Sequence, residues 1–183
     1  MILRTKELLE DLQKTICEKL ETLDGGNNFS EKRATTVEGG SSCAKILVGE
    51  NIEKAAVNFT HSIGDSLPRA VSDSKTYIAG NPFEAVSLSL IVHPANPFAP
   101  TTHMNMRLFV VKTEPVEWHF GGGYDLTPIY GFEEDALLWH AGASEAAVNF
   151  YGEMKQKCDD YFYLPHRDEQ RGIGGLFFDD FCG

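Results

Sequence analysis

The chain has 183 residues, of which 42% are hydrophobic and 23% are charged, and its formal net charge is −11. This length and composition fit one globular domain over residues 1–183 with a core of its own, and argue against a disordered chain. The acidic balance argues against nucleic acid or an anionic membrane surface as a partner. An anionic ligand would therefore need a local cluster of basic side chains.

The sequence has no sign of export or of a membrane span. It begins with charged residues instead of the apolar core of a signal peptide, and no apolar run approaches the roughly 20 residues that cross a bilayer. The cysteines are scattered and form no Cys-x-x-Cys pair: Cys17, Cys43, Cys158 and Cys182. We expect a cytoplasmic protein whose thiols are reduced.

The N-terminal part of the chain mixes helical and extended patterns. Apolar residues recur every three or four positions over 4–24, which predicts an amphipathic helix that ends at Gly25-Gly26. The polar stretch 27–36 is predicted to be a loop. Strands are expected over Cys43–Val48 and Glu53–Thr60, and a linking loop over Gly64–Pro82.

A hairpin follows, and its alternation is the most informative feature of the sequence. The strands Ala85–His93 and Thr102–Lys112 are joined by a proline-rich turn. Because side chains alternate faces along a strand, His103, Asn105 and Arg107 share one face and the methionines between them share the other. An imidazole, a carboxamide and a guanidinium in one row suit a ligand with carboxylates or phosphates. A solvated sheet face is the alternative interpretation.

After this hairpin the pattern predicts a third strand, two helices and a last strand. The strand covers Val116–Phe120. We expect Gly121–Gly123 to break the sheet there and to let a flat ligand or another backbone come close, with a tight bend as the alternative. Thr127 before Pro128 has the pattern of a helix N-cap. The helices are expected over Glu133–Ala141 and from Ser144 to about Tyr161, and the strand over Gly172–Asp180.

No sequence motif identifies a cofactor. There is no Gly-x-Gly-x-x-Gly after a strand, no Walker loop and no nucleophile elbow. No histidine pair has the i, i+4 spacing of a metal site on a helix.

Three blocks of sequence nevertheless resemble oxygen-dependent coproporphyrinogen III oxidase, in family order. The blocks are His93-Pro94-x-Asn96-Pro97-x-x-Pro100-Thr101-x-His103-x-Asn105-x-Arg107-x-Phe109, then Trp118-His119-Phe120-Gly121-Gly122-Gly123-Tyr124-Asp125-Leu126-Thr127-Pro128, then Cys158-Asp159-Asp160-Tyr161-Phe162 with Gln170-Arg171-Gly172-Ile173-Gly174-Gly175 and Phe177-Phe178-Asp179-Asp180. The resemblance implies an α+β fold in which helices cover an antiparallel sheet.

The resemblance also implies a reaction. Two propionates of coproporphyrinogen III become vinyl groups, with molecular oxygen as co-substrate, to give protoporphyrinogen IX in heme biosynthesis. It implies that no organic redox cofactor is needed, and that the enzyme is a homodimer. Four histidines in or near the matching blocks become candidate ligands of a divalent metal ion or proton donors: His93, His103, His140 and His166.

Individual roles follow from the same resemblance. Arg107 is the candidate clamp for a propionate, and His103 is the candidate general acid or base. Substrate hydrogen bonds are expected from Ser89, from Asn105 and from the backbone around Met106. Asp180, or Asp179 beside it, is the candidate acceptor for the pyrrole N–H groups.

The resembling family has a longer chain, and its last third has no counterpart in this sequence. We therefore expect an incomplete sheet edge, low stability and weak catalysis from the chain as given. Three functions remain open: an active oxidase, an inactive domain that binds a tetrapyrrole, and a histidine-rich metal-binding domain.

Overall fold

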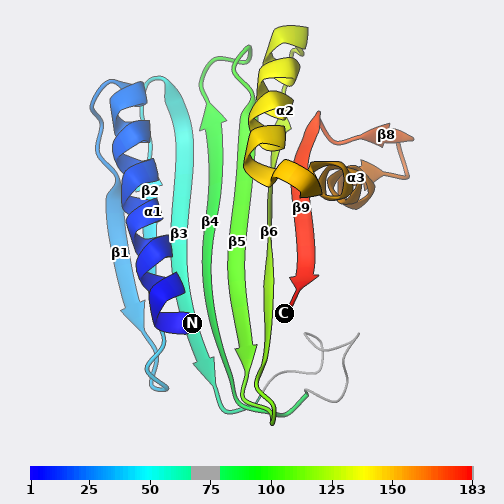
Figure 1. The fold of residues 1–183 in the computed structure, drawn as a ribbon. Coiled ribbons are helices and arrows are strands. Elements are labelled where there is room, and N and C mark those ends of the chain that lie inside the picture. The colour runs from blue at the N-terminus through cyan, green and yellow to red at the C-terminus, as the bar shows by residue number, and fades with distance from the viewer. Residues whose placement is uncertain (67–78, 183) are drawn as a thin grey trace.

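An antiparallel sheet forms the centre of the molecule (Figure 1). The computed structural model describes residues 1–66 and 79–182, apart from the side chain of Asp180. In this part of the chain the sheet has seven strands, whose spatial order follows the sequence: β1 (Ser30–Thr35), β2 (Ser41–Leu47), β3 (Ile52–Gly64), β4 (Phe83–Pro94), β5 (Thr101–Val111), β6 (Glu117–Thr127) and β9 (Gly174–Phe181).

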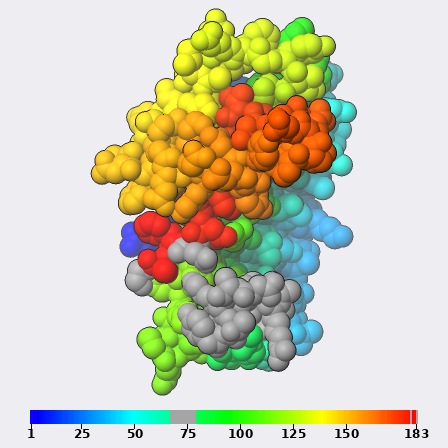
Figure 2. Space-filling model, turned by 90° about the vertical axis from the view of Figure 1, so that its right-hand side faces the viewer, coloured from blue at the N-terminus to red at the C-terminus, as the bar shows by residue number. Residues whose placement is uncertain are grey.

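Helices lie on one face of the sheet and at one of its edges. Helix α1 (Ile2–Asp24) and helix α2 (Glu133–Ala147) cover the face that Figure 1 turns towards the viewer. A short 3₁₀ turn (Val148–Phe150) leads into α3 (Tyr151–Phe162), which packs beside β9. The small hairpin of β7 (Tyr163–Leu164) and β8 (Glu169–Gln170) extends this layer, and Figure 2 shows both on the outer side of β9. The expected α+β architecture is confirmed.

The strand alternation divides the sheet into an apolar and a polar face. Val86, Leu88 and Leu108 point to α1 and are fully buried against it. On the opposite face Ser89 pairs with Asn105, and Ser87 with Arg107. Residues that face each other across antiparallel strands share one side of the sheet, so the polar row expected from the sequence is confirmed.

The N-terminal helix, the central hairpin and the last strand agree with the sequence patterns within a few residues. Helix α1 ends where expected, because Gly25 adopts φ 97° and the N–H of Gly26 bonds Glu21 O at 2.9 Å. The predicted loop at 64–82 lies mostly outside the described residues.

The prediction of a loop over 27–36 is wrong, because β1 occupies Ser30–Thr35. Every residue of β1 is exposed, so the strand has no buried face and no apolar alternation to reveal it. Its backbone is held instead by pairing with β2, from Ser30 opposite Ile46 to Thr35 opposite Ser41. The charged side chains of this edge strand also discourage pairing with another chain.

The prediction that Gly121–Gly123 break the sheet is also wrong, whereas the expected close approach of another backbone is confirmed. Strand β6 runs through them to Thr127, so Thr127 is the end of a strand and not a helix cap. A Cβ at Gly122 would lie 2.6 Å from Asn105 O of β5, and one at Gly123 would overlap Leu176 O of β9. The glycines therefore let three strands approach each other closely.

The break between the second and third helices lies after Ala147, where Val148 has φ 48°, and not near Gly142.

No helix within 1–66 and 79–182 is long and apolar enough to cross a membrane.

Candidate functional site

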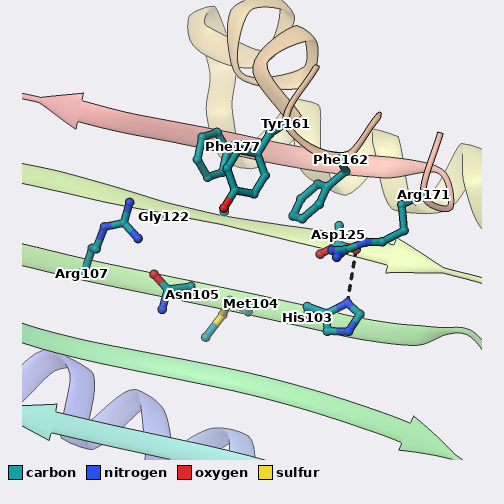
Figure 3. Close-up of a pocket in the computed structure, with 11 residues that line it drawn as sticks. His103, Met104, Asn105, Arg107, Gly122, Asp125, Tyr161, Phe162, Arg171 and Phe177 are labelled. Atoms are coloured by element: carbon teal, nitrogen blue, oxygen red, sulfur yellow. Dashed lines mark hydrogen bonds and ion pairs between the residues drawn. The ribbon is translucent and has the colours of Figure 1, made fainter. Parts of the chain in front are cut away.

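A cavity of about 300 Å³ opens on the polar face of the sheet, where β5, β6 and β9 meet the end of α3 (Figure 3). Strands β5 and β6 form its floor, and aromatic rings from α3 and β9 form a wall. The lining residues are His103, Met104, Asn105, Arg107, Gly122, Gly123, Asp125, Tyr161, Phe162, Arg171 and Phe177. Its size is at the lower end of ligand pockets, roughly 300–1,000 Å³.

The carboxylate of Asp125 organises one end of this pocket. Asp125 is 1% exposed, and it lies directly opposite His103 in the pairing of β5 with β6. Its Oδ2 accepts hydrogen bonds from Arg171 Nη2 at 3.0 Å and from Thr127 Oγ1 at 3.2 Å. The ion pair with Arg171 compensates the buried charge, which would otherwise be strongly unfavourable.

The same oxygen orients His103. Asp125 Oδ2 lies 3.2 Å from His103 Nδ1. Because a carboxylate only accepts hydrogen bonds, Nδ1 carries the proton and donates it. Nε2 is then the ring nitrogen that is left to exchange a proton with a ligand. The side chain of His103 is 31% exposed, so solvent and ligands reach it.

Arg171 joins this network to the aromatic wall. The central carbon of its guanidinium lies 3.8 Å from the centre of the Phe162 ring, a cation–π contact that fixes the plane of the group. Next to it, the rings of Tyr161 and Phe177 stack with their centres 4.3 Å apart. The wall offers flat apolar surface to a flat ring.

Asn105 lies in the middle of the floor, and its side-chain oxygen is buried without a hydrogen-bond partner. Arg171 Nε has the same property. An unsatisfied buried polar atom costs about 1–3 kcal/mol, which a ligand of matching polarity would recover. Asn105 Oδ1 therefore suits a ligand N–H group.

Arg107 marks the other end of the pocket. It is 42% exposed, and its Nη2 donates a hydrogen bond to Asp179 Oδ2 at 2.8 Å. With Arg171, it places two guanidinium groups in the cavity of a chain that is acidic as a whole. Each guanidinium is paired with a carboxylate, Arg171 with Asp125 and Arg107 with Asp179, so an anionic ligand has to compete for them.

The structure brings together part of the predicted site. His103, Asn105 and Arg107 line the cavity, and Ser89 lies next to them across the β4–β5 pairing. Met106 lies inside the ladder between β4 and β6, and its side chain packs on the α1 face, so the expected role of the backbone around it stays a prediction. The side chain of Asp180 lies outside the described residues, whereas Asp179 contacts Arg107.

The four candidate metal ligands do not come together. His140 Nε2 donates to Ile173 O at 2.9 Å, and Tyr151 donates to its Nδ1 at 3.1 Å, so His140 ties α2 to the neighbouring layers. His93 is exposed at the end of β4, and His166 is exposed between β7 and β8. Across the described ranges no group of three His, Cys, Asp or Glu side chains is arranged to hold a metal ion.

Asp125, Arg171 and the three aromatic residues were missed as site residues, although they lie in the matching blocks. Treating Gly121–Gly123 as a strand would have placed Asp125 on the face of His103, two residues beyond Gly123. For Arg171 no local pattern exists, because it precedes β9 in an irregular segment.

A family model described as coproporphyrinogen III oxidase matches residues 4–183. The chain belongs to the coproporphyrinogen III oxidase family. Coproporphyrinogen oxidases are oxygen-dependent oxidoreductases of heme biosynthesis. Their substrate is coproporphyrinogen III, and they use O₂ without an organic cofactor. The seven-stranded antiparallel sheet with its packed helices is consistent with the coproporphyrinogen oxidase fold.

Proposed function

We propose that this chain catalyses the aerobic oxidative decarboxylation of two propionates of coproporphyrinogen III to vinyl groups, giving protoporphyrinogen IX. The observation that carries the proposal is the presence, in one pocket, of an accessible guanidinium at Arg107 and of the oriented His103–Asp125 couple. Reaction at a propionate side chain needs a carboxylate anchor and a proton-transfer group held in place.

The geometry supports the following proposed substrate-binding roles. Arg107 binds a propionate, since its planar fork matches a carboxylate. Asn105 Oδ1 accepts a hydrogen bond from a pyrrole N–H and thereby gains the partner that it lacks. One pyrrole ring packs against the wall formed by Tyr161 and Phe177. Ser89 extends the polar floor towards β4.

Proton transfer is assigned to His103. In each round a propionic acid side chain, R–CH₂–CH₂–COOH, and O₂ become R–CH=CH₂, CO₂ and H₂O₂. The electron-rich pyrrole and its side chain supply the electrons that reduce O₂, and protons must move at the ring and at the reduced oxygen. His103 Nε2 is the atom that takes up or delivers such a proton, while Asp125 holds Nδ1–H and stabilises the imidazolium.

The family resemblance also leads us to propose a homodimer, and the scattered cysteines lead us to propose a cytoplasmic location. Light scattering on the purified chain tests the oligomeric state, and cell fractionation tests the location. A monomer that turns over substrate would remove the dimer from the proposal and leave the reaction in place.

The function is tested by turnover of coproporphyrinogen III in air and under anaerobic conditions, with the porphyrin product read by fluorescence after oxidation. We expect vinyl-bearing product and one CO₂ per vinyl group only in air. Binding of the tetrapyrrole without turnover would support the inactive binding domain instead. Turnover at the same rate without O₂ or any other oxidant would contradict the proposed reaction.

The role of Arg107 is tested by Arg107→Ala. Loss of a charge-assisted bond to a carboxylate should weaken tetrapyrrole binding roughly tenfold or more, with little change in stability because Arg107 is 42% exposed. Arg33→Ala is the matched control, since Arg33 lies on the exposed edge strand β1 and its guanidinium forms an ion pair with Glu31. Equal binding by Arg107→Ala and the parent chain would contradict the role of Arg107 as a clamp.

A further inference from the structure

The guanidinium that we assign to the substrate carboxylate already holds a carboxylate of the protein. Arg107 Nη2 and Asp179 Oδ2 lie 2.8 Å apart, and the two side chains are 42% and 48% exposed. Such a pair contributes little to stability, because water competes for both partners. In the pair of Arg171 and Asp125, by contrast, the side chain of the carboxylate is only 2% exposed. The first pair is therefore the one that a ligand can open.

A bulge in the edge strand aims Asp179 at Arg107. Phe120 of β6 pairs with Phe181 of β9, and Gly122 pairs with Phe178. Between these two pairs β6 has the single residue Gly121, whereas β9 has the two residues 179 and 180. A β-bulge is defined by two residues on one strand that lie opposite a single residue on its partner. Such a bulge redirects side chains and bends the strand.

Gly121 provides the space in which the two side chains meet. A Cβ on Gly121 would lie 2.5 Å from Asp179 Oδ1 and 3.0 Å from Arg107 Nε. The Asp179 carboxylate and the Arg107 guanidinium thus meet directly above Gly121, where β6 has no side chain. The contact is built by two local features, the bulge in β9 and the glycine in β6.

We propose that Asp179 is an internal competitor for Arg107, which a substrate propionate must displace and which returns when that propionate has become a vinyl group. This inference rests on the proposed function for the identity of the substrate. A ligand with a carboxylate exchanges one ion pair for another at Arg107. A ligand with a neutral group at the same place leaves the pair of Arg107 and Asp179 intact.

Asp179 affects the binding of substrate and of product differently. It weakens the binding of a propionate, because the ion pair of Asp179 with Arg107 must open first. It does not oppose a vinyl group, and it pairs with Arg107 again once CO₂ has left. Asp179 therefore limits binding at this place to ligands whose carboxylate is well positioned, and it resets the site after reaction.

The test compares the parent chain with Asp179→Asn and Asp179→Ala. Affinity is measured for coproporphyrin III, the stable oxidised tetracarboxylate, by fluorescence, and for its tetra-amide, which has no carboxylate. Affinity for propionate alone is measured from the NMR shift of the Arg107 side-chain Nε–H. Glu153→Gln is the matched control, since it removes one negative charge from an ion pair with Lys157 on the surface of α3.

Both Asp179 variants should bind coproporphyrin III and propionate about two- to fivefold more tightly than the parent, the range set by exposed ion pairs. Binding of the tetra-amide should not change, and Glu153→Gln should behave as the parent with every ligand. Unchanged propionate affinity in both Asp179 variants would overturn the inference. Failure of the parent to bind coproporphyrin III would count against the proposed function alone, because the propionate measurement still reports on Asp179.

Discussion

At the scale of single residues, the site depends on one carboxylate oxygen. Asp125 Oδ2 accepts hydrogen bonds from an imidazole, a guanidinium and a hydroxyl group. Each donor therefore limits the positions of the other two. The orientation of His103 is a property of this group of residues and not of His103 by itself.

The coupling of His103 with Asp125 can be measured in a double-mutant cycle. His103→Ala should lower turnover by about 10² or more, because it removes the group to which we assign proton transfer. Asp125→Asn should also lower turnover, since an amide at this position permits the wrong tautomer of His103. In the double variant the two losses should not add, because residues that act as a unit are non-additive.

Asp125→Asn should lower stability as well, by roughly 1.5–3 kcal/mol, since Arg171 loses its charged partner. Urea unfolding of the same set of variants measures this effect separately from turnover. Fully additive losses in turnover would mean that Asp125 acts on catalysis by a route other than His103.

At the scale of elements, the close contact of β5, β6 and β9 gives the pocket its shape. The glycines of β6 form the floor, and β9 brings Phe177 to the wall that Tyr161 of α3 completes. A shift of β9 relative to β6 would therefore move the wall away from His103 and Arg107. The strand spacing and the ligand site are linked.

Gly123→Ala tests this link. The new methyl group would overlap Leu176 O and lie 3.1 Å from Phe177 Cα, so β9 must move. Overpacking of this kind typically costs about 1–3 kcal/mol. We expect lower stability in urea and weaker binding of coproporphyrin III.

Gly142→Ala is the matched control for that prediction. Gly142 lies inside helix α2, and a Cβ there would meet nothing within 4 Å. Removing a glycine from a helix interior should raise stability by about 0.5–1 kcal/mol without changing ligand binding. Equal effects of the two glycine substitutions on binding would contradict the link between strand spacing and the site.

At the scale of the whole molecule, the reactivity of buried thiols can show whether the two ends of the sheet unfold together. Cys17 in α1 and Cys158 in α3 are buried, as is Cys43, whereas Cys182 is exposed. Burial raises the pKa of Cys17 and of Cys158 to about 11, from 9.0. Because the thiolate is the reactive form, both thiols are protected by low accessibility and by low ionisation.

We therefore expect a thiol reagent at pH 8 to modify Cys182 in the native protein and to leave the other three cysteines unmodified. In increasing urea, Cys17 and Cys158 should become reactive at the same concentration, because the common sheet joins the two ends into one cooperative unit. Mass spectrometry of peptides measures each site. Exposure of Cys158 well before Cys17 would show that the β9 end unfolds separately.

The raised thiol pKa values also predict a loss of stability in alkali. In the unfolded chain the thiols ionise near pH 9, while in the folded protein they stay neutral to about pH 11. A folded-state pKa above the unfolded value means that the folded state binds more protons in this range. The free energy of unfolding should therefore decrease as the pH rises from about 9 to about 11.

Much of the fold and part of the site follow from local sequence. The two-residue period of β4 and β5 places His103, Asn105 and Arg107 on one face, and burial of the opposite face against α1 keeps this register. The apolar period of residues 4–24 determines α1 in the same way. The edge strand β1 could not be predicted, since only its pairing with β2 holds it.

The rest of the site is decided by the tertiary structure. The partners of the central hairpin lie far along the chain: Asp125 is 22 positions from His103, Arg171 is 46 from Asp125, and Asp179 is 72 from Arg107. Their contacts require β6 to continue through its glycines, β9 to pair with it, and a bulge to turn Asp179 inwards. Sequence alone identified the candidate groups for carboxylate binding and proton transfer. Only the packing of β9 and α3 on β6 determined which charges meet, because that packing depends on strand spacing and not on any local period.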